Sequence, residues 1–170
     1  MSSLATTLGL RAANGLQPPS YAGYYLIWNF LFAYGFTSTR TLKQILGIDH
    51  NVSPREDLTK YGPAAVSSGK ITQNQLDMLK RNEAAHQNSY EHFPVFASAM
   101  VWAHVAGLDM TDINVSALVY TVVRLAYVGI YVGVDTAGLS QLRGLCWWTG
   151  NVVCMRLFWK GMRAINAGKA

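Results

Sequence analysis

Stretches with few charged residues alternate with one polar stretch along this chain of 170 residues. Residues 12–39 contain no Asp, Glu, Lys or Arg, and aromatic side chains stand at both ends of the segment Ser20 to Phe36. Tyr and Trp concentrate at the two faces of a bilayer, and a helix of roughly 20 residues crosses it. The pattern therefore predicts a first membrane span at about residues 20–40.

Three more apolar stretches follow the polar one. Thr72 and Gln75 have the spacing of a capping box, so the first of these helices begins in polar sequence. A soluble bundle is the alternative, but it needs a polar face on every helix, and the first and third stretches lack one. We therefore predict an all-α membrane protein, a four-helix transmembrane bundle in one domain (1–170). Its later spans are expected at about residues 75–108, 113–134 and 142–162.

The polar stretch at about residues 47–73 is rich in Gly, Pro, Ser and mixed charges, which is typical of a loop. Basic residues around it place this loop in the cytosol by the positive-inside rule. The net charge is +5, but the basic residues form no stripe, which argues against nucleic-acid binding. No His, Cys, Asp and Glu set has metal-ligand spacing, so we predict no metal.

Two helical segments carry polar groups at matching intervals. At ~100° per residue, Arg81, Asn88 and Glu91 share one helix face just before the second span. In the same way, Arg124 lies inside the third span and shares a helix face with three tyrosines. An arginine inside a membrane costs ~2.5–3.5 kcal/mol and tends to find a partner. The residues that share the Arg124 face are Tyr120, Tyr127 and Tyr131.

These two stripes allow two interpretations. In the first, Glu91 neutralises Arg124 across two helices and the tyrosines pack beside them. In the second, the same groups bind a ligand: arginines suit carboxylates, Glu91 suits an ammonium group, and tyrosines suit a thiol or a peptide carbonyl. A small, anionic, zwitterionic peptide would satisfy all of them.

The segments "RNEAAHQNSYEHFPVFASAMVWA" and "LVYTVVRLAYVGIYVGV…QLRGLCWWTG" resemble the MAPEG family (membrane-associated proteins in eicosanoid and glutathione metabolism). The resemblance covers about residues 20–165. Its strongest parts are the motifs Asn88-x-x-Glu91-x-x-Pro94 and Arg124-x-x-Tyr127-x-x-x-Tyr131. The resemblance implies a homotrimer of four-helix subunits that binds glutathione between neighbouring subunits, in sites open to the cytosol.

The resemblance also implies roles for individual residues. Arg143 matches the arginine that activates the glutathione thiol, although it stands twelve positions after Tyr131. Ala84 stands where family members often carry an arginine, and Arg81 is the nearest substitute. The glutathione-binding residues expected in this chain are Arg40, Arg81, Asn88, Glu91, Arg124, Tyr127 and Tyr131.

We therefore expect a glutathione-dependent transferase or peroxidase in the endoplasmic reticulum or another intracellular membrane. Its second substrate would be a lipophilic electrophile or a lipid hydroperoxide that reaches the site from the membrane lipid. Two alternatives remain open. One is a non-catalytic lipid-binding scaffold of the same family, and the other is an isomerase or cyclase that acts on a lipophilic substrate.

Overall fold

The computed structural model describes residues 4–7, 9–11 and 18–168, and within these residues the chain forms helices and no strands. The predicted all-α class is therefore confirmed. The π-helical segments are labelled η. The elements in chain order are α1 (Leu4–Thr7), α2 (Ala22–Leu31), η1 (Phe32–Phe36), α3 (Arg40–Ile45), η2 (Asp57–Tyr61), α4 (Gly62–Ser67), α5 (Gln73–Val105), α6 (Met110–Gly133), α7 (Ala137–Ser140) and α8 (Leu142–Asn166).

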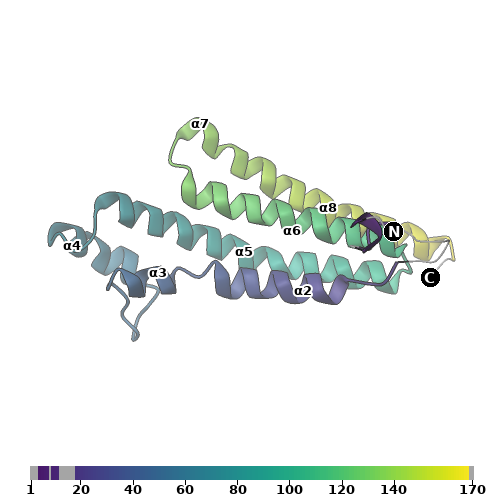
Figure 1. Ribbon diagram of the computed structural model, residues 1–170, viewed down its shortest axis with the longest axis horizontal. Helices are drawn as coiled ribbons and strands as arrows, with labels where there is room; N and C mark the ends of the chain where they lie inside the picture. Colours follow the sequence, from purple (N-terminus) through teal and green to yellow (C-terminus); the bar gives the residue numbers. More distant parts are fainter. Residues whose placement is uncertain (1–3, 8, 12–17, 169–170) are drawn as a thin grey trace.

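Four helices, α2, α5, α6 and α8, run side by side along the long axis of the molecule (Figure 1). The short helices α3, α4 and α7 lie at one end, which we call the loop end. α1 and the last turn of α8 lie at the other, which we call the terminal end. Both termini therefore lie on the same side of the bundle.

Small residues let the long helices approach closely. Ala99 and Ala103 on α5, Ala117 on α6 and Gly150 and Gly161 on α8 are all buried where these helices meet. Lipid tails are as apolar as leucine, so helices in a bilayer associate through close packing rather than through a hydrophobic driving force. The larger buried side chains between them are Phe96, Met100, Ile113, Tyr120, Cys154 and Leu157.

The outer faces of the four helices are apolar. Exposed fractions reach 74% for Tyr24, 67% for Val105, 54% for Val122 and 66% for Leu145. In water, contiguous apolar surface of this extent would favour aggregation or association. Among the described residues, α6 is the one helix long and apolar enough to be a candidate membrane span by itself. α5 is polar in its first half, and α8 carries four basic residues.

The first helix ends earlier than the predicted segment 20–40. Its last turn is the π-helical η1, and the helix stops at Thr37, whose N–H bonds to the Phe32 carbonyl at 3.1 Å. The side-chain amide of Asn82 on α5 then donates to the Thr37 carbonyl at 3.3 Å and to the Thr39 hydroxyl at 3.0 Å. These contacts with α5 separate α3 from the helix before it.

The later helices begin and end close to the predicted positions. The Thr72 hydroxyl accepts from the Gln75 N–H at 3.2 Å, and the Gln75 side chain accepts from the Thr72 N–H at 2.8 Å, which confirms the predicted capping box. Gly107, with φ of +63°, ends α5, and the Asp109 carboxylate then caps α6 by accepting from two backbone N–H groups. α5 and α6 are therefore joined by a tight turn.

The region predicted as a loop, 47–73, contains η2 and α4 and has a core of its own. We call residues 40–72 the loop unit. Its buried members Ile48, Leu58, Ala65 and Ile71 pack against Leu76 and Leu79 in the first turns of α5. The charged residues of this region suggested a surface loop. The few apolar residues between them nevertheless form a small second core.

A buried ionic cluster fixes the loop unit. Asp57 is fully buried and lies 2.9 Å from the Lys43 ammonium and 3.0 Å from the His50 Nδ1. Burial alone raises the pKa of the Asp57 carboxyl, but the Lys43 and His50 contacts outweigh it and hold the pKa below its ordinary value of 3.8. The ring of Tyr61 stacks on His50, with centroids 3.9 Å apart. His50 therefore has a structural partner, although its side chain is half exposed.

Candidate functional site

Two arginines and two tyrosines form a continuous column at the loop-end half of α6. The Arg124 guanidinium lies 4.5 Å from the ring centre of Tyr127, whose ring lies 5.5 Å from that of Tyr131. The Arg143 guanidinium lies 4.4 Å from the ring of Tyr131. Cations over aromatic faces attract each other electrostatically, so α6 positions both arginines through its own tyrosines. Residues predicted from separate motifs are thus brought together.

The long spacing between Tyr131 and Arg143 is taken up by α7. This short helix folds the chain back, and the Arg143 Nε donates to the Ser140 carbonyl at 3.0 Å. Arg143 thereby returns to the level of Tyr131, although it stands twelve positions further along the chain. It is half-buried, so one side of its guanidinium remains accessible.

Arg124 is the buried end of the column, with 2% of its surface exposed. Its Nη2 donates to the Asn88 carbonyl at 3.0 Å and contacts the Ser89 hydroxyl at 3.4 Å, and both groups belong to α5. Its Nη1 has no hydrogen-bond partner within the described residues. A buried donor without a partner is costly, which makes this nitrogen a candidate contact for an added acceptor.

The ion pair between Arg124 and Glu91, which was one of the two interpretations of the sequence, is not formed. Glu91 is exposed and accepts from the Gln87 amide at 2.8 Å, one turn away on α5. Arg124 instead faces the buried side of α5, where Ser89 and His92 lie. Glu91 lies about 100° from His92 around the helix, which turns its carboxylate away from that side.

Arg81 and Asn88 lie along the partly open edge of α5. The Arg81 Nε donates to the Val132 carbonyl at 3.2 Å, so Arg81 joins the last turn of α6 next to Tyr131. The Asn88 side chain donates to the Ala84 carbonyl at 2.9 Å. Both side chains are half-buried, which leaves them accessible from outside the single chain.

Arg40 lies apart from this group. It belongs to the loop unit, where its guanidinium lies 3.7 Å from the Asp49 carboxylate and donates to the Asn51 side chain. The structure of one chain thus brings Arg81, Asn88, Arg124, Tyr127, Tyr131 and Arg143 together and leaves Arg40 and Glu91 outside that set.

The set carries uncompensated positive charge. Within the described residues, no carboxylate lies within 4.0 Å of Arg81, Arg124 or Arg143. The basic residues Lys43, Arg156 and Lys160, by contrast, each have an acidic partner. Three arginines without carboxylate partners, one each from α5, α6 and α8, can bind an anion that carries more than one acidic group.

Sequence reasoning did not identify the polar groups behind Arg124. His92 is buried and its Nδ1 lies 3.0 Å from the Tyr120 hydroxyl, while Ser89 contacts Arg124 directly. The sequence signal for these groups is a repeat at intervals of three and four residues, which marks one face of a helix. The buried face of α5 follows this repeat through Ala85, Ser89, His92 and Phe96.

Comparison with known proteins identifies the family. The MAPEG family model matches residues 19–163, which is most of the chain. The chain belongs to the MAPEG family. Members of the MAPEG family are membrane proteins that include glutathione transferases, peroxidases and isomerases, and they typically use glutathione. No significant match was found among curated proteins or among solved structures.

Proposed function

We propose that this MAPEG protein is a glutathione-dependent transferase or peroxidase that acts on lipophilic electrophiles or lipid hydroperoxides. The observation that carries the proposal is the column of Arg124, Tyr127, Tyr131 and Arg143, joined by Arg81 and without a carboxylate partner. In this proposal the chain crosses an intracellular membrane four times, assembles as a homotrimer and binds glutathione between subunits.

The donor set fits the ligand. Glutathione carries two carboxylates, one ammonium group and one thiol. Arg81 suits a carboxylate, because charge-assisted bonds from guanidinium groups are strong and directional. The Nη1 of Arg124 is enclosed in the single chain and would meet a second carboxylate only if the site opens on binding. The exposed carboxylate of Glu91 suits the ammonium group, provided that it faces a neighbouring subunit.

The open edge of the site supports a location between subunits. Asn88, Tyr131 and Arg143 are half-buried in the single chain, and Glu91 is exposed. On α5 these residues lie where the buried face meets the outer face. On α6 and α8 they lie in the turns at the loop end. A second chain packed on this border would enclose a ligand that one chain only half surrounds, and Arg40 of the loop unit could then reach the site across the interface.

In this proposal Arg143 is the thiol-activating group. A guanidinium next to a thiol stabilises the thiolate, which is the nucleophilic form. Stacking on Tyr131 and the bond to Ser140 hold Arg143 in one orientation while leaving one side free. Holding the thiolate beside a lipophilic partner can supply about 7–11 kcal/mol of the barrier in a well-oriented site.

Calorimetric titration of the purified protein with glutathione tests the proposal. We expect Tyr131→Phe to weaken binding about fivefold, since one hydrogen bond contributes about 1 kcal/mol. We expect Glu91→Ala to weaken it further, because hydrogen bonds to charged groups are worth more. His50→Ala is the control, because His50 lies in the loop unit. Equal affinity in all three variants would remove the proposed site.

Activity then separates the candidate functions. A transferase should conjugate glutathione to a chlorodinitrobenzene-type electrophile. The Arg143→Gln variant should lose this activity. Binding of glutathione without any turnover would favour a scaffold, which is supported by Ala84 in place of an arginine and by the long turn before Arg143. Turnover of a lipophilic substrate that persists without any thiol would point to an isomerase.

A further inference from the structure

A second group of charged residues lies at the terminal end of the bundle, far along α8 from Arg143. The Asp112 carboxylate in the first turn of α6 accepts bonds from Arg156 at 2.5 Å and from Lys160 at 2.6 Å. Arg156 also donates to the Ser116 hydroxyl at 3.1 Å. One carboxylate therefore neutralises only one of two cations, and both cationic side chains remain more than 40% exposed.

Arg163 extends this basic surface by one turn. At ~100° per residue, Arg156, Lys160 and Arg163 share one face of α8. The Arg163 side chain is exposed and has neither a hydrogen bond nor an ion pair within the described residues. Asp109 and Asp112 at the start of α6 supply two negative charges against these three basic residues, which leaves one positive charge in excess. The last turns of α8 thus carry surplus positive charge.

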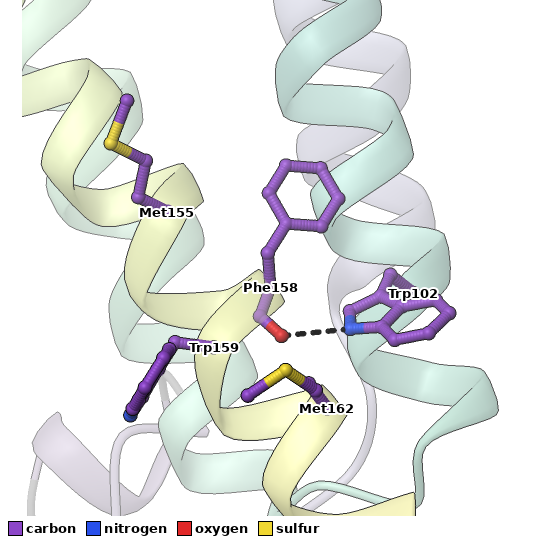
Figure 2. A pocket seen from close by; sticks show the side chains of 5 residues that line it. All are labelled: Trp102, Met155, Phe158, Trp159 and Met162. Atoms are coloured by element: carbon purple, nitrogen blue, oxygen red, sulfur yellow. Dashed lines mark hydrogen bonds between the residues drawn. The ribbon is translucent and has the colours of Figure 1, made fainter.

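An apolar groove lies beside these basic residues. It has a volume of about 590 Å³ and is lined by Trp102 of α5 and by Met155, Phe158, Trp159 and Met162 of α8 (Figure 2). The Trp102 indole donates to the Phe158 carbonyl at 3.0 Å, and this hydrogen bond links α5 to α8 beside the groove. Trp159 is 61% exposed and stands between the groove and the basic face.

The height of this surface matches the edge of a bilayer. Asp112 lies in the first turn of the candidate membrane span, and Trp102 and Trp159 have the amphipathic rings that concentrate at headgroup level. Long basic side chains near the ends of such helices extend toward the same level. Phosphate groups of lipids occupy that zone, and acyl chains begin directly beneath it.

We propose that the terminal end of α8 binds an anionic phospholipid. Its phosphate lies against Arg163 and the exposed sides of Arg156 and Lys160, and an acyl chain follows the groove between Trp102 and Met162. Charge complementarity argues for this occupant: a neutral lipid or a purely apolar helix would leave the surplus cations unbalanced, whereas an anionic headgroup balances them where they lie.

Fluorescence quenching by brominated lipids tests the proposal on the full chain in nanodiscs. We compare brominated phosphatidylglycerol with brominated phosphatidylcholine, and use Trp159→Phe to identify the quenched signal. The expected result is a preference for the anionic lipid, reduced about fivefold in Arg163→Gln, because one basic residue near an anionic surface contributes about that factor. Arg55→Gln removes the same charge from the loop unit and should keep the preference.

Four results would overturn the proposal. Equal quenching of the unaltered protein by both lipids would mean unselective contact with the bilayer. A preference that survives in Arg163→Gln would place the anion elsewhere. No quenching of Trp159 by either lipid would mean that a second protein chain covers the groove. Inorganic phosphate in solution should not abolish the preference; if it does, the site binds free anions rather than lipid.

Discussion

Two buried ionic residues illustrate opposite ways of accommodating charge. Asp57 is fully enclosed, and both of its oxygens have cationic or polar partners. Arg124 is almost as buried, yet one of its nitrogens has no partner within the described residues. A satisfied buried pair stabilises one conformation, whereas an unsatisfied donor gains stability from an added acceptor. The first residue therefore belongs to the scaffold and the second to a candidate site.

The ion pair at Asp57 predicts a stability change in acid. Because the folded pKa is depressed, the contribution of Asp57 to stability is present above its ordinary value of 3.8 and is lost as the pH falls through the lower folded value. Asp57→Asn should remove this acid dependence. It should also cost about 3–5 kcal/mol at neutral pH, because Lys43 would remain buried without its partner.

Hydrogen exchange of backbone amides in residues 43–61, measured across pH, gives the free energy of local opening. Glu56→Gln is the matched control, since Glu56 is exposed and, among the described residues, forms an ion pair only with the exposed Lys60. A similar loss of protection in both variants would contradict a special role for Asp57.

At the scale of elements, α5 and α8 depend on one close approach. A Cβ atom added to Gly161 would come within 2.3 Å of the Trp102 Nε1 and within 3.1 Å of the Ala106 Cβ. The Trp102 ring is held by its bond to the Phe158 carbonyl, so it cannot move aside without losing that bond. The two helices therefore fit together at this level because residue 161 has no side chain.

We predict that Gly161→Ala lowers thermal stability in detergent. Overpacking a tight contact typically costs about 1–3 kcal/mol, and the hydrogen bond of Trp102 would be lost in addition. Gly144→Ala in the same helix is the control, because a Cβ atom there meets nothing within 4 Å. Alanine should be neutral or slightly stabilising at residue 144, since it favours helices over glycine by about 1 kcal/mol. Equal melting temperatures for both variants would contradict the prediction.

At the scale of the whole molecule, the two ends of the bundle differ in chemistry. The loop end carries the loop unit and the arginine–tyrosine column, and the terminal end carries α1, the end of α8 and the apolar groove. If the four long helices all cross the membrane, these ends face opposite compartments. The balance of basic residues predicts that the loop end faces the cytosol.

Labelling of single cysteines in sealed vesicles tests this topology. Val52→Cys, at a position 97% exposed in the loop unit, and Ala167→Cys, exposed at the end of α8, are introduced after Cys146 and Cys154 are replaced by alanine. An impermeant maleimide added outside cytosol-side-out vesicles should label residue 52 and not residue 167. Labelling of both positions from one side would exclude the proposed crossings.

The sequence predicted much of this molecule because helix signals are local. The capping box at Thr72 and the stripe of Arg124 and its tyrosines depend on residues within a few turns. The relation of Arg124 to Glu91 depends on how α5 is rotated against α6, which no spacing along one helix reveals. The return of Arg143 to Tyr131 depends on the fold of α7, a helix too short to leave a periodic pattern.

The length of α5 has a practical consequence for imaging. α5 has 33 residues and α6 has 24, so at ~1.5 Å per residue α5 projects roughly 14 Å further at the loop end. The loop unit is fixed to that projection through Leu76 and Leu79. A compact marker protein inserted next to Val52 would therefore lie outside a detergent belt. It would provide a rigid feature for aligning particles of this small protein in electron micrographs.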